Sequence, residues 1–115
     1  MVLVNARNDV TIASDVNLAL TRAERRKGLL GRDSLDPSAA LVISPCSSIH
    51  TMFMRFPIDV IFLDRDNRVV KVITAMKPWR TALGGRGAQS ALELEAGALE
   101  ANGLQPGDVI ALSDG

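Results

Sequence analysis

Short apolar segments separated by turn residues run the length of this chain, and this pattern constrains the fold more than any other feature. Apolar and polar residues alternate in 10–16 and 91–95, as they do in a β-strand with one buried face. Further strands are predicted at residues 40–43, 49–56, 60–63, 69–73 and 109–112. Many short strands predict a mainly β protein, a small antiparallel β-sandwich or barrel.

One or two short helices are predicted beside the strands. Thr21 and Glu24 have the spacing of a capping box, in which the hydroxyl and the carboxylate each accept a backbone N–H at the start of a helix. This helix should run for about two turns and end near Gly31, since glycine adopts the left-handed conformation that stops a helix. Residues 96–102 predict a second helical turn, ending at Gly103. Residues 81–87, which include three glycines, are expected to be flexible.

Length and cysteine content indicate an ordinary globular domain. A chain of 115 residues predicts a single domain, residues 1–115, with enough apolar surface to bury a core without disulfides or metals. Cys46 is the only cysteine, so no internal disulfide can form. No apolar run approaches the roughly 20 residues of a membrane span, and no signal peptide is visible. We therefore expect a soluble, cytoplasmic protein without a membrane partner.

Charge is unevenly distributed, although the formal net charge is zero. Residues 1–86 carry all 13 basic and 8 acidic residues, a net charge of +5, whereas residues 87–115 carry 5 acidic residues and none that is basic. The two segments would offset each other if they packed side by side. Alternatively, a basic face would form from Arg22, Arg25, Arg26, Lys27 and Arg32. Zero net charge and an aromatic content of 3% argue against a nucleic-acid partner.

Residues 46–64 combine polar groups that can do chemistry with the most apolar part of the sequence. They contain the only His, the only Cys and all three Phe. If residues 49–56 form one strand, His50 shares an apolar face, which is predicted to be buried, with Met52, Met54 and Phe56. His50 would then be a core histidine bonded to a backbone carbonyl, a residue that contacts a ligand or acts in catalysis, or a metal ligand. Since the chain has no second His or Cys, neither a metal nor a cofactor is predicted.

Asp59 lies just before an apolar segment, and a buried carboxylate needs a cationic or backbone donor. Arg25, Arg32 and Arg55 are the candidate cations, because a guanidinium can donate two parallel hydrogen bonds to a carboxylate. Asp59 would either hold the helix onto the sheet or, together with His50, orient a ligand.

Three further features have both a structural and a functional interpretation. Cys46 and His50 are four residues apart, which permits but does not require a nucleophilic pair. Trp79, between Lys77 and Arg80, either packs over a sheet edge or forms a stacking platform beside a cleft. Glu93 alternates with Leu92 and Leu94, so it is predicted to be solvated or paired.

The spacing of particular residues resembles an uncharacterised bacterial and archaeal family, the domain of unknown function 192, over residues 16–112. The resemblance rests on Thr21, Arg25, Gly28, Leu29, Leu30 and Arg32; on Ile49, His50, Thr51, Met54, Arg55, Phe56, Pro57, Ile58 and Asp59; and on Leu92, Glu93, Leu94, Ala96, Gly97, Gly107 and Asp108. It implies a mainly β fold of jelly-roll type and supplies no catalytic residues.

Three functions remain open from the sequence. The leading hypothesis is a β-domain that binds a small anionic or polyhydroxylated ligand near His50, Thr51, Arg55 and Asp59, with Arg25 or Arg32 at the edge. The second is a hydrolase-like enzyme in which Asp59 orients His50 as a general base. The third is a protein-interaction module without a small-molecule site. Neither catalysis nor the oligomeric state is predicted.

Overall fold

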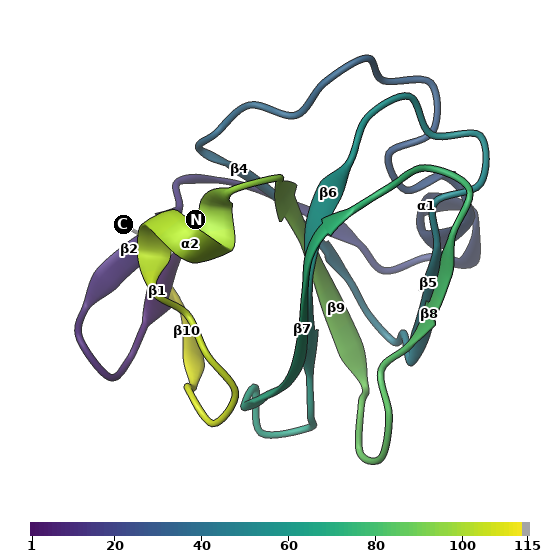
Figure 1. The fold of residues 1–115 in the computed structure, drawn as a ribbon. Coiled ribbons are helices and arrows are strands. Elements are labelled where there is room, and N and C mark those ends of the chain that lie inside the picture. Colours follow the sequence, from purple (N-terminus) through teal and green to yellow (C-terminus); the bar gives the residue numbers. More distant parts are fainter. Residues whose placement is uncertain (114–115) are drawn as a thin grey trace.

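Three β-sheets lie side by side in the computed structural model, which describes residues 1–113 (Figure 1). The central sheet has five strands in the order β3-β4-β9-β6-β7. Their bounds are β3 Asp15–Ala19, β4 Ala39–Ile43, β9 Ser90–Glu95, β6 Ile58–Leu63 and β7 Val69–Met76. Apart from the parallel pair β3 and β4, neighbouring strands in this sheet are antiparallel.

A smaller sheet lies on each side of the central one. The first has the order β10-β1-β2, with β10 at Ile110–Ser113, β1 at Val2–Asn5 and β2 at Val10–Ala13. The second pairs β5, Ser48–His50, with β8, Thr81–Leu83. The mainly β class predicted from the sequence is confirmed in a sandwich-like arrangement. The strands do not close into a barrel, and the jelly-roll topology implied by the family resemblance stays a prediction.

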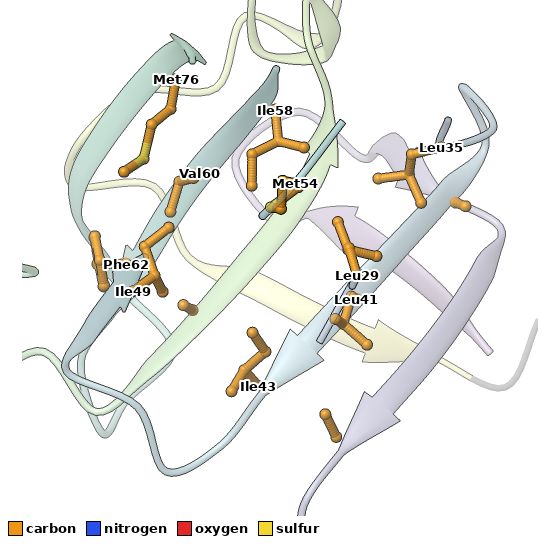
Figure 2. Packing of buried hydrophobic residues seen from close by; sticks show 13 residues of the cluster. Leu29, Leu35, Leu41, Ile43, Ile49, Met54, Ile58, Val60, Phe62 and Met76 are labelled. Atoms are coloured by element: carbon orange, nitrogen blue, oxygen red, sulfur yellow. The ribbon is translucent and has the colours of Figure 1, made fainter. Parts of the chain in front are cut away.

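Both faces of the central sheet are covered, because alternate residues of β6 enter two different cores. Ile58, Val60 and Phe62 pack into a cluster with residues of β4 and β5 (Figure 2). Ile61 and Leu63 pack into a second cluster, with residues of β1, β2 and β10. Every residue of β6 is therefore buried, and five of the six residues of β9 are buried as well.

Both helices form close to the positions that the sequence predicts. Helix α1, Arg22–Lys27, begins with the predicted capping box: Thr21 accepts the N–H of Glu24, and the Glu24 carboxylate accepts the N–H of Thr21. It ends at Gly28, whose φ of 46° is left-handed, and so stops earlier than the predicted end near Gly31. Helix α2, Ala98–Asn102, ends at Gly103 as predicted.

The predicted strand at residues 49–56 is wrong beyond its first two residues. Strand β5 ends at His50, because Thr51 is drawn into hydrogen bonds with the segment before β8 rather than into a ladder. The alternation of side chains stops there, and Phe53 adopts a φ of 64°. The predicted burial of His50 is consequently wrong, and its side chain is exposed.

Two other boundaries differ from the prediction. Residues 10–16 are not one strand, since β2 and β3 separate at Ser14, whose backbone N–H bonds to Ser38. Residues 81–87, predicted to be flexible, begin with the regular strand β8. The hairpin predicted at residues 64–68 is confirmed, with Asn67 at a left-handed φ of 62°.

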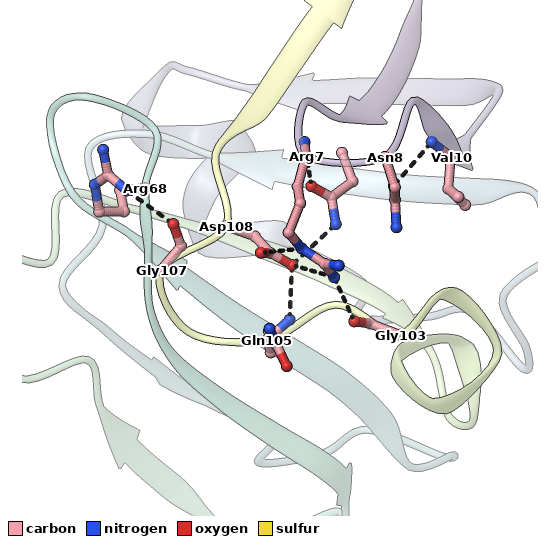
Figure 3. A network of polar contacts seen from close by, with 9 residues as sticks. Arg7, Asn8, Val10, Arg68, Gly103, Gln105, Gly107 and Asp108 are labelled. Atoms are coloured by element: carbon pink, nitrogen blue, oxygen red, sulfur yellow. Dashed lines mark hydrogen bonds and ion pairs between the residues drawn. The ribbon is translucent and has the colours of Figure 1, made fainter.

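A polar network joins β1 to the loop before β10 (Figure 3). The carboxylate of Asp108 accepts hydrogen bonds from the side chains of Asn5 and Arg7 and from the backbone N–H of Gln105. The hydrogen bond from Arg7 contributes most to lowering the pKa of Asp108 to about 2. This carboxylate is fully engaged in holding the two segments together.

Asp59 is completely buried. Among the hydrogen bonds of residues 1–113, its carboxylate accepts only from backbone N–H groups. Its carboxylate accepts the N–H groups of Ala75 at 2.7 Å, Gly97 at 3.0 Å and Leu99 at 2.9 Å. The predicted backbone partnership is thus confirmed, whereas the predicted latch to Arg25, Arg32 or Arg55 is wrong. The carboxylate fastens β6 to β7 and to the start of α2.

Replacing Asp59 should therefore destabilise the fold strongly. Asp59→Ala leaves three backbone N–H groups without an acceptor, and we expect the free energy of unfolding to fall by about 4 kcal/mol. Urea unfolding monitored by circular dichroism measures the difference. Asp64→Ala is the matched control, since Asp64 accepts two N–H groups in an exposed turn. Equal losses in the two variants would contradict the role assigned to Asp59.

Candidate functional site

A cleft of about 400 Å³ opens between α1, the segment around β5 and the surface of strand β9. It lies on the face of the central sheet that the two-stranded sheet covers. Its lining comes from three parts of the chain: residues 22–30, residues 43–54 and Glu93. The residues around it are Arg22, Arg25, Arg26, Lys27, Gly28, Leu29, Leu30, Ile43, Pro45, Cys46, Ser47, Ser48, Ile49, His50, Met54 and Glu93.

Helix α1 supplies the cationic side of the cleft. Four of its six residues, Arg22, Arg25, Arg26 and Lys27, are basic and line the cavity. Glu24, the acidic residue of the helix, offsets one of these charges; its carboxylate accepts the N–H of Thr21, and the hydrogen bonds with Thr21 lower its pKa. The ion pairs found within residues 1–113 do not involve α1. The helix therefore carries a net positive charge, from four basic residues and one acidic residue.

Glu93 contributes a carboxyl to the lining of the cleft. It lies on β9 between Leu41 and Val60 of the adjacent strands, and it is only 4% exposed. Its Oε2 atom is buried without a hydrogen-bond partner in the described part of the chain. Burial raises the pKa of this carboxyl to about 7, so that it is partly protonated at neutral pH.

The predicted solvation or pairing of Glu93 is wrong. The prediction of a solvated or paired side chain assumed that β9 has one exposed face, as the alternation with Leu92 and Leu94 indicates. The structure covers both faces of this strand, so the residue between the two leucines is also buried. No local pattern could reveal this, because the second covering comes from residues about forty positions earlier in the chain.

Cys46 and His50 both line the cleft, but each has a partner of its own. The Cys46 thiol donates a hydrogen bond to the carbonyl of Ser48 at 3.0 Å, and burial raises its pKa. The Nδ1 atom of His50 accepts the backbone N–H of Met52 at 3.3 Å. A thiol that keeps its proton is a poor nucleophile, so this geometry gives no support to a nucleophilic pair.

The six residues predicted to bind a ligand do not form one site. His50 and Arg25 line the cleft. Arg32 and Thr51 do not line it, and Arg55 instead pairs with Asp33 at 2.6 Å.

Asp59 points away from the cleft. It alternates with Ile58 and Val60, which face the cluster beneath the cleft, and its carboxylate bonds to α2 on the other side of the sheet. The structure does not bring His50 and Asp59 together.

The sequence did not indicate that Thr51 is buried and joins two loops. Its hydroxyl donates to the carbonyl of Lys77 at 2.6 Å and accepts the N–H of Arg80 at 3.0 Å, and it is fully buried. These bonds join the loop after β5 to the loop before β8. Side by side on the two loops lie Phe53 and Trp79, whose ring centroids are 4.7 Å apart.

Within residues 1–113, no group of three or more His, Cys, Asp or Glu side chains is arranged to hold a metal ion. No helix in this part of the chain is long and apolar enough to cross a membrane.

A mainly β domain with a cationic cleft above a buried carboxyl is the class of protein that this geometry defines. The family model described as Uncharacterized ACR, the domain of unknown function 192, matches residues 3–112. The chain belongs to this family. The resemblance found in the sequence is confirmed, and the match begins earlier than residue 16.

Several archaeal proteins are similar in sequence. A UPF0127 protein of Pyrococcus horikoshii is 36% identical over 114 residues, covering 94% of this chain and 96% of the relative. A UPF0127 protein of Pyrococcus furiosus is 42% identical over 62 residues, 54% of this chain, and that match spans only 53% of the relative's own length.

The fold is also found in a solved structure. The crystal structure of a protein of unknown function from Novosphingobium aromaticivorans has a TM-score of 0.84 at 22% identity, covering 96% of this chain and 82% of the other. At this identity the likeness concerns the fold alone.

Glu93 should make stability depend on pH. Because its pKa is raised from 4.5 to about 7 on folding, its contribution is fully favourable below pH 4.5 and is lost as the pH rises through 7. A shift of this size corresponds to about 3 kcal/mol. Glu93→Gln removes the charge. The gain in the free energy of unfolding of this variant over the wild type should therefore be larger at pH 8 than at pH 5.

Urea unfolding at both pH values measures this difference. Glu100→Gln, at an exposed position of α2, is the control for loss of a surface carboxylate and should change stability by less than about 0.5 kcal/mol. A Glu93→Gln effect that is the same at pH 5 and pH 8 would show that the carboxyl does not titrate as a buried group.

Proposed function

We propose that this protein binds a small anionic or polyhydroxylated ligand in the cleft beside α1. The observation that carries the proposal is the set of four cationic side chains from one short helix around a cavity of about 400 Å³, with no acidic partner for them in the ion pairs of residues 1–113. Guanidinium groups recognise carboxylate and phosphate oxygens through paired hydrogen bonds.

Neutral hydrogen-bonding groups support the polyhydroxylated part of the proposal. The hydroxyls of Ser47 and Ser48 and the imidazole of His50 line the same cleft and can each donate or accept a hydrogen bond. Apolar side chains, Leu29 and Met54 among them, would pack against the carbon skeleton of a ligand. A hydrolase built on His50 and Asp59 gains no support from the geometry. A cytoplasmic location stays a prediction.

Binding should depend on the charges of α1. We expect phosphate, citrate, gluconate or glucose 6-phosphate to raise the thermal midpoint of the protein. Exchanging Arg22 and Arg26 together for alanine should weaken the binding of any such compound about tenfold or more, since each charged hydrogen bond contributes about 1.5–3 kcal/mol. Isothermal titration calorimetry measures the affinity.

Arg22 and Arg26 suit this test because both are exposed, so that the fold should survive their loss. The double variant Arg65→Ala, Arg86→Ala removes the same charge from exposed positions outside the cleft and should bind like the wild type. If no compound binds at millimolar concentration, or if both double variants bind equally well, the cleft is not an anion site.

A second candidate function, a protein-interaction module, is favoured by the aromatic pair. Phe53 is 71% exposed and Trp79 is 53% exposed, with φ values of 64° and 66°. Bulky residues rarely adopt this left-handed region, and backbone strain of this kind often marks functional surfaces. The hydrogen bonds of Thr51 fix both loops, and preorganised aromatic residues are typical of binding hot spots. Lys77 and Arg80 flank Trp79, so this surface would fit an acidic segment of another protein.

Selection from a random-peptide phage library tests this second function. We expect acidic peptides to be enriched, and their binding to be lost in Trp79→Ser, since the indole would form the centre of the contact. Leu83→Ser is the matched control, because Leu83 is 72% exposed but does not belong to the pair. Peptides that bind both variants equally would refute a protein partner at this surface. Binding to phosphatidylglycerol vesicles through Trp79, in place of peptides, would refute it as well.

A further inference from the structure

Polarity changes in order from the mouth of the cleft to its interior. The cationic side chains of α1 are largely exposed, with Arg22, Arg26 and Lys27 all at the surface. Leu29 and Met54, which also line the cavity, are buried and apolar. The wall formed by β9 carries Glu93, which is buried in turn. A ligand that fills the cavity therefore meets positive charge near the surface and a carboxyl in a buried part of the lining.

Glu93 restricts what the inner end of a ligand can be. A second anionic group would be repelled by the carboxylate form and would have to leave water in a buried place. An ammonium group fits less well than a hydroxyl. It has three donors and no acceptor, and Glu93 is the only acidic side chain that lines the cleft. A hydroxyl group suits both protonation states, because it donates to the carboxylate and accepts from the neutral acid.

We infer that the ligand is a hydroxylated oxyanion, such as a sugar phosphate or sugar acid, whose anionic group contacts α1 and whose hydroxyls bond to Glu93. This inference rests on the proposed function and assigns Glu93 as the residue that determines specificity. It also gives the unpartnered Oε2 atom of Glu93 a role, since a buried polar atom without a partner costs stability unless something satisfies it.

Such a site should discriminate strongly between hydroxylated ligands and those that lack hydroxyl groups. When a site is built to hydrogen-bond a hydroxyl, a compound that lacks it leaves a buried polar group unpaired. A cleft that recognises only the anion would bind hydroxylated and unhydroxylated compounds alike. The two cases are separable with compounds of equal charge and similar length.

Glycerol 3-phosphate and propyl phosphate form such a pair, with the same phosphate on a three-carbon chain. Calorimetry should show that glycerol 3-phosphate binds the wild type at least about tenfold more tightly. In Glu93→Leu, which keeps the volume but removes the carboxyl, its affinity should fall to that of propyl phosphate, while propyl phosphate itself is unaffected. Gluconate and hexanoate should repeat the pattern for carboxylates.

Each other outcome has a definite meaning. Equal binding of the two phosphates, with no effect of Glu93→Leu, overturns the inference while the proposed anion site stands. Binding of none of the anions overturns the proposed function as well. Tighter binding of phosphoethanolamine than of glycerol 3-phosphate overturns the hydroxyl assignment in favour of an ammonium group. Circular dichroism of Glu93→Leu verifies that the variant is folded.

Discussion

Burial of both faces of the central sheet is the constraint on which the rest of the structure depends. Both faces of strands β6 and β9 are buried, because alternate residues of each strand enter two separate cores. Every polar side chain on these strands must then find a partner inside the protein, since water is excluded. Asp59 meets this requirement with three backbone N–H groups, and in doing so it fastens α2 to the sheet. Glu93 does not meet it, since its Oε2 atom has no hydrogen-bond partner within residues 1–113.

The contrast between these two carboxyls separates a structural role from a candidate functional one. Asp59 is satisfied by rigid donors of its own chain and needs nothing from outside. Glu93 faces a cavity, and the same burial that leaves it unpaired raises its pKa to about 7. Helix α1 adds cations to the lining of the same cavity, because four of its six residues are basic and one is acidic. Exposed cations and a buried carboxyl in the lining of one cavity are the physical basis of the ligand class inferred above.

Local chemistry accounts for the parts of the fold that the sequence predicted well. The capping box of Thr21 and Glu24, the stop at Gly103 and the hairpin at residues 64–68 all depend on residues within a few positions of one another. Predictions that relied on one continuous strand at residues 49–56 failed. The hydroxyl of Thr51 found its partners 26 and 29 residues later in the chain, and no periodicity within the segment encodes that contact.

The sequence by itself determined the mainly β class, the family, the start of α1 and the basic character of that helix, because these depend on residue type and short-range spacing. It also identified His50 and Arg25, two of the residues around the cleft. Only the tertiary structure decided that Glu93 is buried and that Asp59 and His50 lie apart. Burial and electrostatic environment are set by the layers packed over each strand, and those layers come from distant parts of the chain.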